Sequence, residues 1–319
     1  MFARRSHRRA AGIALGFLAD LLLGDPRRGH PVAGFGTGAA RLETHTYADS
    51  RGAGALHTGL LLGGLAGLGW VAGRGGRIWV TAAATYVALG GTSLNRVGHQ
   101  MSRLLTTDDV AGARRLLPSL CGRDPAALDA SGLTRATVES LAENTSDAQV
   151  APLFWAAIGG VPGVLVYRGA NTLDAMIGHR SPRYHHFGWA AARFDDLLNY
   201  VPARLTGVLA VLCALVVGGS PVAALRAWRR DAARHPSPNA GVAEASFAGA
   251  LGVRLGGPTQ YAHQLEIRPT LGDGRIPEVA DVARAVRLSR AVQAAAAAVA
   301  VLLAVSVASR SGRRSSPRW

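Results

Sequence analysis

Six apolar runs divide the chain, and each approaches the length that a lipid bilayer requires. The strongest runs are 55–73, 203–219 and 291–308, and the weaker ones are 10–23, 78–94 and 150–167. A membrane-spanning helix needs about 20 mostly apolar residues. Gly-Gly-Val-Pro-Gly at 159–163 interrupts the run at 150–167. Such a break favours a kink or a re-entrant helical hairpin over a straight span.

The composition indicates a helical membrane protein. Of the 319 residues, 49% are hydrophobic and 17% are charged, whereas soluble domains typically carry about 25% charged residues. The 40 glycines and the scarcity of aromatic residues suit closely packed helices better than sheets. We therefore predict an all-α, polytopic integral membrane bundle of about 4–6 spans, with polar helical loops that form a site at one membrane face. Residues 1–319 are expected to form one membrane-embedded domain, ending in a basic, disordered tail at 310–319.

The residues at the two ends of the chain predict how the bundle is oriented in the membrane. Both termini are rich in arginine, which favours the cytoplasmic side for each. The N-terminus resembles a signal peptide, but Asp20 interrupts its apolar core and no small-residue cleavage site follows, so we expect an uncleaved first segment. Six straight spans would place the polar stretches 95–149 and 168–202 on opposite faces. A re-entrant segment at 150–167 would bring them to the same face.

The net charge of +15 comes from arginine alone. All 35 basic residues are Arg, and the sequence contains no Lys. The arginines are spread along the chain and are not interleaved with aromatic residues, so we expect no nucleic-acid partner. Without Lys there is neither a P-loop Lys nor a Schiff-base Lys. Any phosphate chemistry must therefore use arginine, a metal ion and backbone amides.

An acidic stripe leads into one of the apolar runs. Glu139, Glu143 and Asp147 are each four residues apart, directly before the run at 150–167. This spacing places the three side chains on one face of a helix, where like charges repel each other. We therefore expect a cation or the arginines of another helix beside the stripe.

A short Asn/Asp pattern is repeated along the chain. "NTSDA" at 144–148 and "NTLDA" at 171–175 echo each other, and "RFDDLLN" at 193–199 adds Asp195, Asp196 and Asn199. Carboxylate and carboxamide oxygens suit Mg²⁺, which commonly takes one or two carboxylates together with substrate phosphates. Arg168 and Arg193 suit bidentate contacts with phosphate or carboxylate. An ion-paired surface helix or a helix cap would explain each of these elements equally well.

Two turn-rich stretches join these candidates. "GDPRRGHPV" at 24–32 carries Asp25 and His30, and "HPSPN" at 235–239 carries His235 and Asn239. The glycines of "GALGVRLGGP" at 249–258 would let the backbone approach a ligand closely or let helices pack.

Together these segments resemble the CobD/CbiB family, the membrane-bound adenosylcobinamide-phosphate synthases of cobalamin biosynthesis. The resemblance covers nearly the whole chain. It rests on "GDP…HPV" at 24–32, "GRD" at 122–124, "VESLAENTSDAQVAPLFW" at 138–155, "NTLDAMIGHR" at 171–180, "ARFDDLLNYVPARL" at 192–205, "HPSPN" at 235–239, "EASFAGALGVRLGGP" at 244–258 and "GD" at 272–273.

The resemblance implies an ATP-dependent amide ligation. A propionate carboxylate of adenosylcobyric acid would be joined to the amine of aminopropanol phosphate, or of aminopropanol, to give adenosylcobinamide phosphate. The implied cofactors are ATP and Mg²⁺, and the implied partners are these two substrates and the lipid bilayer. Association with other cobalamin-assembly enzymes is left open. The implied location is the cell membrane, with several spans and an active site that faces the cytoplasm.

The same segments carry the predicted residue roles. We expect Glu143, Asp147, Asp174 and Asp196 to be Mg²⁺ ligands or their supports, and Glu139 or His235 to be the catalytic base. The predicted substrate- and phosphate-binding residues are Asp25, His30, Asn144, Arg168, Asn171, Arg193, Asp195, Asn199 and Asn239.

Two other classes of function fit the residues without the resemblance. An intramembrane Asp-rich transferase would act on prenyl diphosphates or lipid phosphates with Mg²⁺ and without ATP. A transporter would use buried Asn and Asp side chains and the broken span as a path for an ion or substrate.

Overall fold

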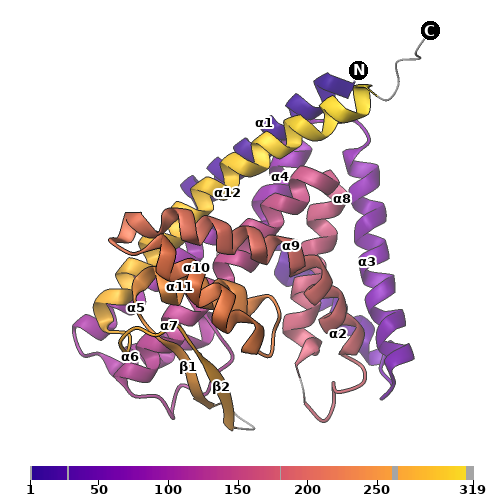
Figure 1. Cartoon of the computed structure of the whole chain (residues 1–319). Helices are drawn as coiled ribbons and strands as arrows, with labels where there is room; N and C mark the ends of the chain where they lie inside the picture. The colour runs from indigo at the N-terminus through magenta and orange to yellow at the C-terminus, as the bar shows by residue number, and fades with distance from the viewer. Residues whose placement is uncertain (1, 27–28, 180, 261–264, 314–319) are drawn as a thin grey trace. The chain divides into compact units, whose positions relative to one another are not determined.

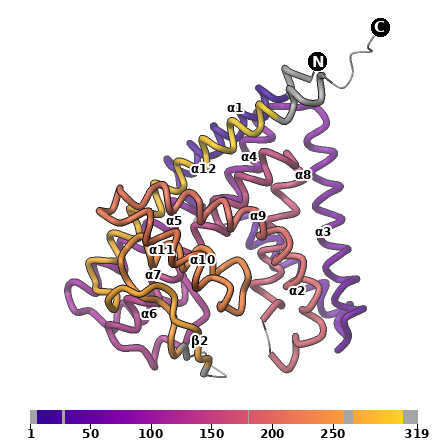
Figure 2. Tube along the Cα trace, viewed as in Figure 1, coloured from indigo at the N-terminus to yellow at the C-terminus, as the bar shows by residue number. Residues whose placement is uncertain are grey.

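The computed structural model describes residues 2–26, 29–179, 181–260 and 265–313. Figure 1 shows its helices and strands, and Figure 2 follows the Cα path of the same elements. The chain divides into two compact units. The first comprises residues 1–90, 151–199 and 296–319, and the second comprises residues 91–150 and 200–295. Helices α9 (Trp189–Cys213) and α12 (Val279–Arg313) contribute to both units.

The described part of the first unit consists of helices joined by loops and turns, without strands. Besides its parts of α9 and α12, its elements are α1 (Phe2–Leu23), α2 (Pro31–Thr46), α3 (Arg51–Gly73), α4 (Ile78–Ala88), α8 (Ala151–Leu173) and the π-helical turn η3 (Asp174–Gly178). Helix α1 packs against α4, and α3 packs against α8. A core cluster that includes Tyr167, Leu173 and Phe187 fills the space between α2, α3, α8 and α9.

Helix α8 reverses its direction at the Gly-Pro break. Gly160 has φ 62° and ψ −147°, and Pro162 follows it. A Cβ atom on Gly163 would lie 2.7 Å from the carbonyl oxygen of Trp155, whereas eight residues of straight helix rise by about 12 Å. Arg9 Nη1 donates to the carbonyl oxygens of Ala157 and Ile158, both at 3.1 Å, and so satisfies acceptors that the break releases. The predicted kink is therefore confirmed.

Four helices are long and apolar enough to cross a membrane, which confirms the predicted all-α, polytopic membrane fold. Within the described part of the chain they are Arg51–Gly73, Ala130–Gly178, Trp189–Val217 and Val279–Ser306. These helices cover or overlap the predicted spans at 55–73, 150–167, 203–219 and 291–308. Two of them also carry the Asn/Asp patterns, so those polar residues lie in helical segments rather than in loops.

Three of the predicted boundaries differ from the structure. The run 78–94 is not one span, because α4 ends at Ala88, Leu89 is extended and α5 begins at Gly91; the glycines at 90 and 91 weaken the helix there. The run 10–23 lies in α1, which is not one of the four membrane-length apolar helices. In the predicted basic tail, α12 continues to Arg313, and residues 314–319 lie outside the described residues.

The second unit surrounds a helix that is buried along its whole length. Its elements, besides parts of α9 and α12, are α5 (Gly91–Thr106), α6 (Val110–Leu116), η1 (Leu117–Ser119), α7 (Ala130–Thr145), the π-helical turn η2 (Ser146–Val150), η4 (Ala214–Val217), α10 (Pro221–Asp231), η5 (Ala232–Arg234), α11 (Ala240–Leu251), β1 (Leu255–Gln260) and β2 (Leu265–Leu271). All twelve residues of α11 are buried, and α11 packs against α7 and α10.

Strands β1 and β2 form an antiparallel ribbon that the sequence analysis did not anticipate. Leu255 pairs with Leu271, Gly257 pairs with Arg268, and a bulge lies between Leu255 and Gly257. Gly256 has φ +83°, and a Cβ atom there would collide with the carbonyl oxygen of Pro269. The glycines at 256 and 257 thus form a bulge, where their positive φ values are tolerated without strain.

Helix α3 presents an open apolar face and a closely packed glycine face. Leu56, Leu60, Leu68 and Trp70 are exposed, and in a span of this length lipid would cover them. A Cβ atom on Gly69 would lie 2.6 Å from Pro162 Cα, because α3 and α8 approach closely there. A Cβ atom on Gly67 would meet no atom within 4 Å.

These two glycines give a matched test of the packing. Gly69→Ala should lower the free energy of unfolding by about 1–3 kcal/mol, because the new methyl group overpacks the α3–α8 contact. Gly67→Ala should be neutral or slightly stabilising, because alanine is the better helix former. Thermal unfolding of both variants in one detergent, followed by circular dichroism, makes the comparison. Equal midpoints for the two variants would contradict this packing.

Candidate functional site

Both Asn-Thr-x-Asp-Ala repeats run into a π-helical turn. Asp147 lies in η2, which follows α7, and Asp174 lies in η3, which follows α8. In each repeat the threonine hydroxyl donates to the carbonyl oxygen four residues back, Thr145 to Leu141 at 2.6 Å and Thr172 to Arg168 at 2.7 Å. π-Helical turns inside α-helices occur frequently at functional sites. Each repeat therefore coincides with a local change of helical geometry and also supplies polar side chains.

The first unit gathers four of the predicted residues around one buried carboxylate. Asn199 Nδ2 donates to Asp195 Oδ2 at 2.9 Å, and Tyr167 Oη donates to Asn199 Oδ1 at 2.9 Å. Asn171 and Asp174 face the same Asp195 carboxylate. The structure thus brings four of the individually predicted residues together in this unit, namely Asn171, Asp174, Asp195 and Asn199, with Tyr167 as an additional member. Two neighbouring carboxylates in buried surroundings are a place where a cation would be stabilised.

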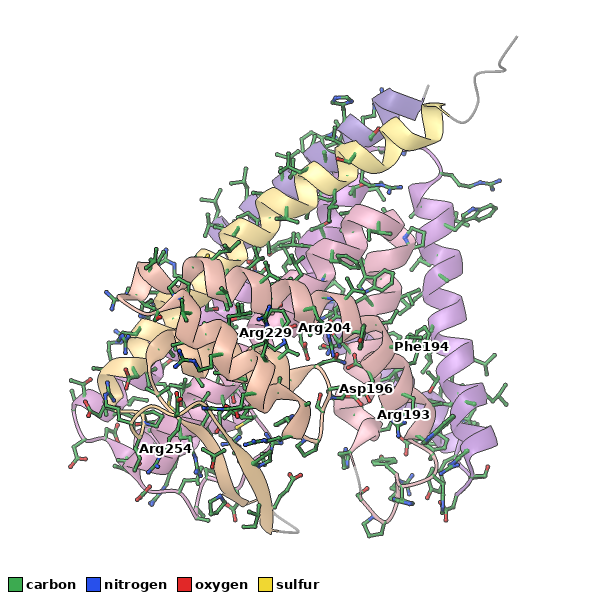
Figure 3. All side chains as sticks on the ribbon, in the orientation of Figure 1. Arg193, Phe194, Asp196, Arg204, Arg229 and Arg254 are labelled. Carbon is green, nitrogen blue, oxygen red and sulfur yellow. The ribbon has the colours of Figure 1, made fainter. Side chains whose placement is uncertain are left out.

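The arginines predicted to bind phosphate differ in their surroundings. Arg168 Nη1 donates to Asn171 Oδ1 at 3.4 Å, and its buried Nε has no hydrogen-bond partner among the described residues. Arg193 pairs with Asp196 at 3.8 Å on the surface of α9, where Figure 3 labels both. The surface ion-pair explanation therefore fits Arg193 and Asp196, while Arg168 keeps an unused donor beside the Asp195 cluster.

Asp25 and His30 form a local pair in the first unit. His30 Nε2 lies 3.7 Å from Asp25 Oδ1, and His30 Nδ1 accepts the backbone N–H of Val32 at 3.2 Å. His30 is thereby the N-cap of α2. Capping accounts for His30 without a ligand.

A buried ion pair anchors the polar cluster of the second unit. Arg123 Nη2 pairs with Glu139 Oε2, and both side chains are almost fully buried. The backbone N–H of Gly256 donates to Glu139 Oε1 at 2.6 Å. Arg135 donates to the carbonyl oxygens of Gly256 and Pro258, both at 2.6 Å. Burial alone would lower the pKa of Arg123, but the Glu139 carboxylate outweighs burial and raises it, so the Arg123 guanidinium stays charged.

Glu244 on α11 faces this ion pair. Its side chain is 1% exposed. Oε1 of Glu244 lies 3.7 Å from His235 Nε2 and 3.8 Å from Arg268 Nη1, and both separations exceed hydrogen-bond length. Burial raises the pKa of Glu244 well above its ordinary value, and the negative charges of Glu139 and Glu143 raise it further. Burial and the Arg268 charge lower the pKa of His235, so its imidazole is neutral at pH 7.

The other predicted residues of the second unit have mainly local partners. Asn144 Nδ2 donates to the carbonyl oxygen of Ser140 at 2.9 Å. Asn239 Oδ1 accepts from Arg204 Nη1 at 2.7 Å, and the Arg204 guanidinium lies 3.8 Å from the centre of the Tyr200 ring. Figure 3 labels Arg204 at this position. Asn239 is therefore held at the start of α11 by an arginine that the sequence analysis did not single out.

A cavity of about 340 Å³ lies beside the β-ribbon of the second unit. Its lining includes Ser131, Arg135, Arg254, Gly256 and Gly257. Two arginines and backbone near Gly256 make this cavity suitable for an anion. Arg254 is labelled in Figure 3.

A metal cage made only of protein ligands is not present in the described residues. No group of three or more His, Cys, Asp or Glu side chains in this part of the chain lies close enough to hold a metal ion. The carboxylates instead occur in smaller groups, such as Asp174 with Asp195 in the first unit. Small groups of this kind suit Mg²⁺ that is shared with substrate phosphates.

Four side chains of these clusters were not named as site residues from the sequence, namely Arg123, Tyr167, Glu244 and Arg268. A signal existed for Glu244, because it is the one acid in the apolar segment "AGVAEASFAGAL" at 240–251, and an isolated ionisable residue in such a segment is costly. Arg123 lies in the segment at 122–124 that carries the family resemblance, but its pairing with Glu139 could not be read from that segment. Arg268 had no comparable signal.

The fold and these clusters define a polytopic helical membrane protein with buried carboxylate–arginine and carboxylate–amide sites. Residues 13–289 match the family described as CobD/Cbib protein, so the chain belongs to the CobD/CbiB family. It is 66% identical over 307 residues to the cobalamin biosynthesis protein CobD of Mycobacterium tuberculosis, covering 95% of this chain and 98% of that one. The proteins of the same name from Chromobacterium violaceum and Rhodobacter capsulatus are 43% and 42% identical, over 86% and 92% of this chain and 90% and 96% of theirs. No solved structure matches the chain.

Removing the anchor of the second cluster should destabilise the protein. Glu139→Gln leaves the buried Arg123 without its anionic partner, so we expect the free energy of unfolding to fall by about 3–5 kcal/mol. Glu278→Gln is the matched control, because Glu278 pairs with Arg275 at an exposed position and such pairs contribute about 0–1 kcal/mol. Denaturant or thermal unfolding in the same detergent measures both variants. A Glu139→Gln variant as stable as the control would show that the ion pair contributes little.

Proposed function

We propose that this protein is an adenosylcobinamide-phosphate synthase, an ATP- and Mg²⁺-dependent acid–amine ligase of cobalamin biosynthesis. It would join a propionate carboxylate of adenosylcobyric acid to the amine of aminopropanol phosphate, or of aminopropanol. The observation that carries the proposal is membership of the CobD/CbiB family over residues 13–289, together with relatives named cobalamin biosynthesis protein CobD. A cobalamin-assembly role implies a corrinoid substrate.

The polar cluster of the first unit supports the phosphoryl-transfer half of this reaction. A carboxylate reacts with an amine only after activation, and ATP would supply the activating phosphoryl group. Asp174 and Asp195 bring two carboxylates near each other, and such a pair fits Mg²⁺ shared with the phosphates. When bound, Mg²⁺ would neutralise negative charge that develops on the transferred phosphoryl group. Arg168, with its unused Nε beside Asn171, would orient the phosphates.

The remaining roles stay predictions that this proposal includes. Asp196 would support Asp174 at the magnesium position. In the second unit, Glu143 and Asp147 would be Mg²⁺ ligands or would support them. Asn171 and Asn199 would orient substrate through their amide groups. The two-arginine cavity at Arg135 and Arg254 is a further candidate for a substrate phosphate. We also propose that the protein lies in the cell membrane with this chemistry on the cytoplasmic side, because both termini are rich in arginine.

A turnover assay on the full chain in detergent tests the proposed function. The reaction would contain Mg²⁺, ATP and adenosylcobyric acid with aminopropanol phosphate or aminopropanol, and mass spectrometry would resolve the corrinoid product. We expect amide product only when ATP is present, with release of ADP, and no reaction after Mg²⁺ is removed with a chelator. Asp174→Asn should lose most of the activity, whereas Asp49→Asn, which alters an exposed pair with His186, should keep it.

Three results would contradict parts of this proposal. Folded protein that forms no amide with either amine would exclude the ligase and favour an Asp-rich transferase with a diphosphate substrate. Amide formation without ATP would exclude the proposed activation step. Full activity in Asp174→Asn would exclude the proposed magnesium position in the first unit.

A further inference from the structure

Three buried polar atoms lie together in the second unit without a hydrogen-bond partner in the described part of the chain. They are Oε1 and Oε2 of Glu244 and Nε2 of His235, and none has a hydrogen-bond partner among the described residues. Nε2 of His235 and Oε1 of Glu244 are 3.7 Å apart. His235 Nδ1 lies 3.1 Å from the carbonyl oxygen of Ser237 and 3.1 Å from its backbone nitrogen. In the tautomer that carries the proton on Nδ1, this N–H donates to the carbonyl oxygen and Nε2 carries a lone pair. Burying unpaired acceptors costs free energy, so a ligand that satisfies them is expected.

The charges around these acceptors favour a cation. Three carboxylates, those of Glu139, Glu143 and Glu244, interact with one another. Two guanidiniums, those of Arg123 and Arg268, face them, and the neutral imidazole of His235 adds no charge. Arg123 is committed to Glu139, and Arg268 also pairs with Glu266 at 3.5 Å. The two guanidiniums are thus shared among several carboxylates, and Glu244 carries the oxygens that accept no hydrogen bond among the described residues.

The donor set suits an alkylammonium group better than a metal ion. Glu139 accepts from Arg123 and from the Gly256 N–H, so it has little capacity left for a metal. No group of three metal-binding side chains exists here within the described residues. Mg²⁺ also requires octahedral geometry and gives up its water reluctantly. A primary ammonium carries three N–H donors. They match the two oxygens of Glu244 and, in the tautomer protonated on Nδ1, Nε2 of His235.

We propose that Glu244 and His235 form the binding site for the ammonium group of the amine substrate. This assignment rests on the proposed function, in which the second substrate is an aminoalcohol or its phosphate. In this assignment Glu244, rather than Glu139 or His235, receives the proton of the amine. Glu139 is the anchor of Arg123, and His235 supplies a lone pair that orients the nitrogen.

The chemical step balances with these groups alone. The ammonium passes one proton to the Glu244 carboxylate, which leaves a neutral amine with a lone pair. That lone pair attacks the carbonyl carbon of the phosphorylated propionate and forms the C–N bond, while the C–O bond to phosphate breaks. Phosphate leaves with the electrons of that bond. The second proton lost from nitrogen goes to solvent with the departing phosphate, and Glu244 gives up its proton when the product leaves.

Hydroxylamine separates the role of Glu244 from the activation of the carboxylate. It is uncharged at neutral pH and traps an activated carboxylate as a hydroxamate without an ammonium site. The experiment compares wild type, Glu244→Gln and the control Glu266→Gln, which alters an acid on β2 that also pairs with Arg268. Each full-length protein receives Mg²⁺, ATP and adenosylcobyric acid, with either aminopropanol phosphate or hydroxylamine. Amide product, hydroxamate, ADP and the unfolding midpoint are measured.

We expect Glu244→Gln to lower kcat/KM for the amine by about 100-fold, the usual scale for loss of a positioned proton acceptor. Hydroxamate formation and ADP release should be unchanged, and the control should match wild type in both reactions. The unfolding midpoint of Glu244→Gln should be equal or higher, because the variant removes an unsatisfied buried carboxylate. A purely structural Glu244 would instead lower the midpoint and both reactions together.

Two results would overturn this assignment. An unchanged amine reaction in folded Glu244→Gln would exclude an ammonium site there. Equal loss of amide and hydroxamate in folded protein would place Glu244 in carboxylate activation instead. If wild type formed neither amide nor hydroxamate and cleaved no ATP, the proposed function itself would fail, and the assignment would fail with it.

Discussion

The buried ion pair between Arg123 and Glu139 is the interaction on which the second unit depends. Glu139 lies in the middle of α7, Arg123 lies in the segment before that helix, and Gly256 of the bulged ribbon donates its N–H to the same carboxylate. One side chain thus ties together a loop, a helix and a strand. Arg123 and the Gly256 N–H contact the two oxygens of Glu139. The Glu139 carboxylate therefore places a negative charge beside Glu244 while its own oxygens are already paired. Burial, together with that negative charge, raises the pKa of Glu244.

The membrane helices could be predicted because length and apolar composition alone decide whether a segment can enter lipid. The reversal in α8 could also be predicted, since Pro162 has no N–H and Gly160 tolerates a positive φ. The end of α4 and the β-ribbon were missed for different reasons. The end of α4 depends on the glycines at 90 and 91, which lie within an otherwise apolar run. The ribbon depends on pairing between Gly257 and Arg268, which no local pattern encodes.

The site was predictable only where its members share a helix. Asp195 and Asn199 are four residues apart on α9 and do form a hydrogen bond, as helical periodicity requires. Contacts between distant segments, such as Arg204 with Asn239, were not visible in the sequence. His30 and Asn144 have local partners, since His30 caps α2 and Asn144 donates to the preceding turn. Polar residue type alone therefore does not separate a structural role from a ligand-binding role.

The central claim is that ATP activates a substrate carboxylate before the amine attacks it. The most direct measurement uses adenosylcobyric acid labelled with ¹⁸O in the reacting carboxylate and follows the label by mass spectrometry. If a phosphorylated carboxylate forms and the amine displaces phosphate, one labelled oxygen must appear in the released inorganic phosphate. Amide formation with unlabelled phosphate would contradict this account, because the carboxylate oxygen would then have left by another route.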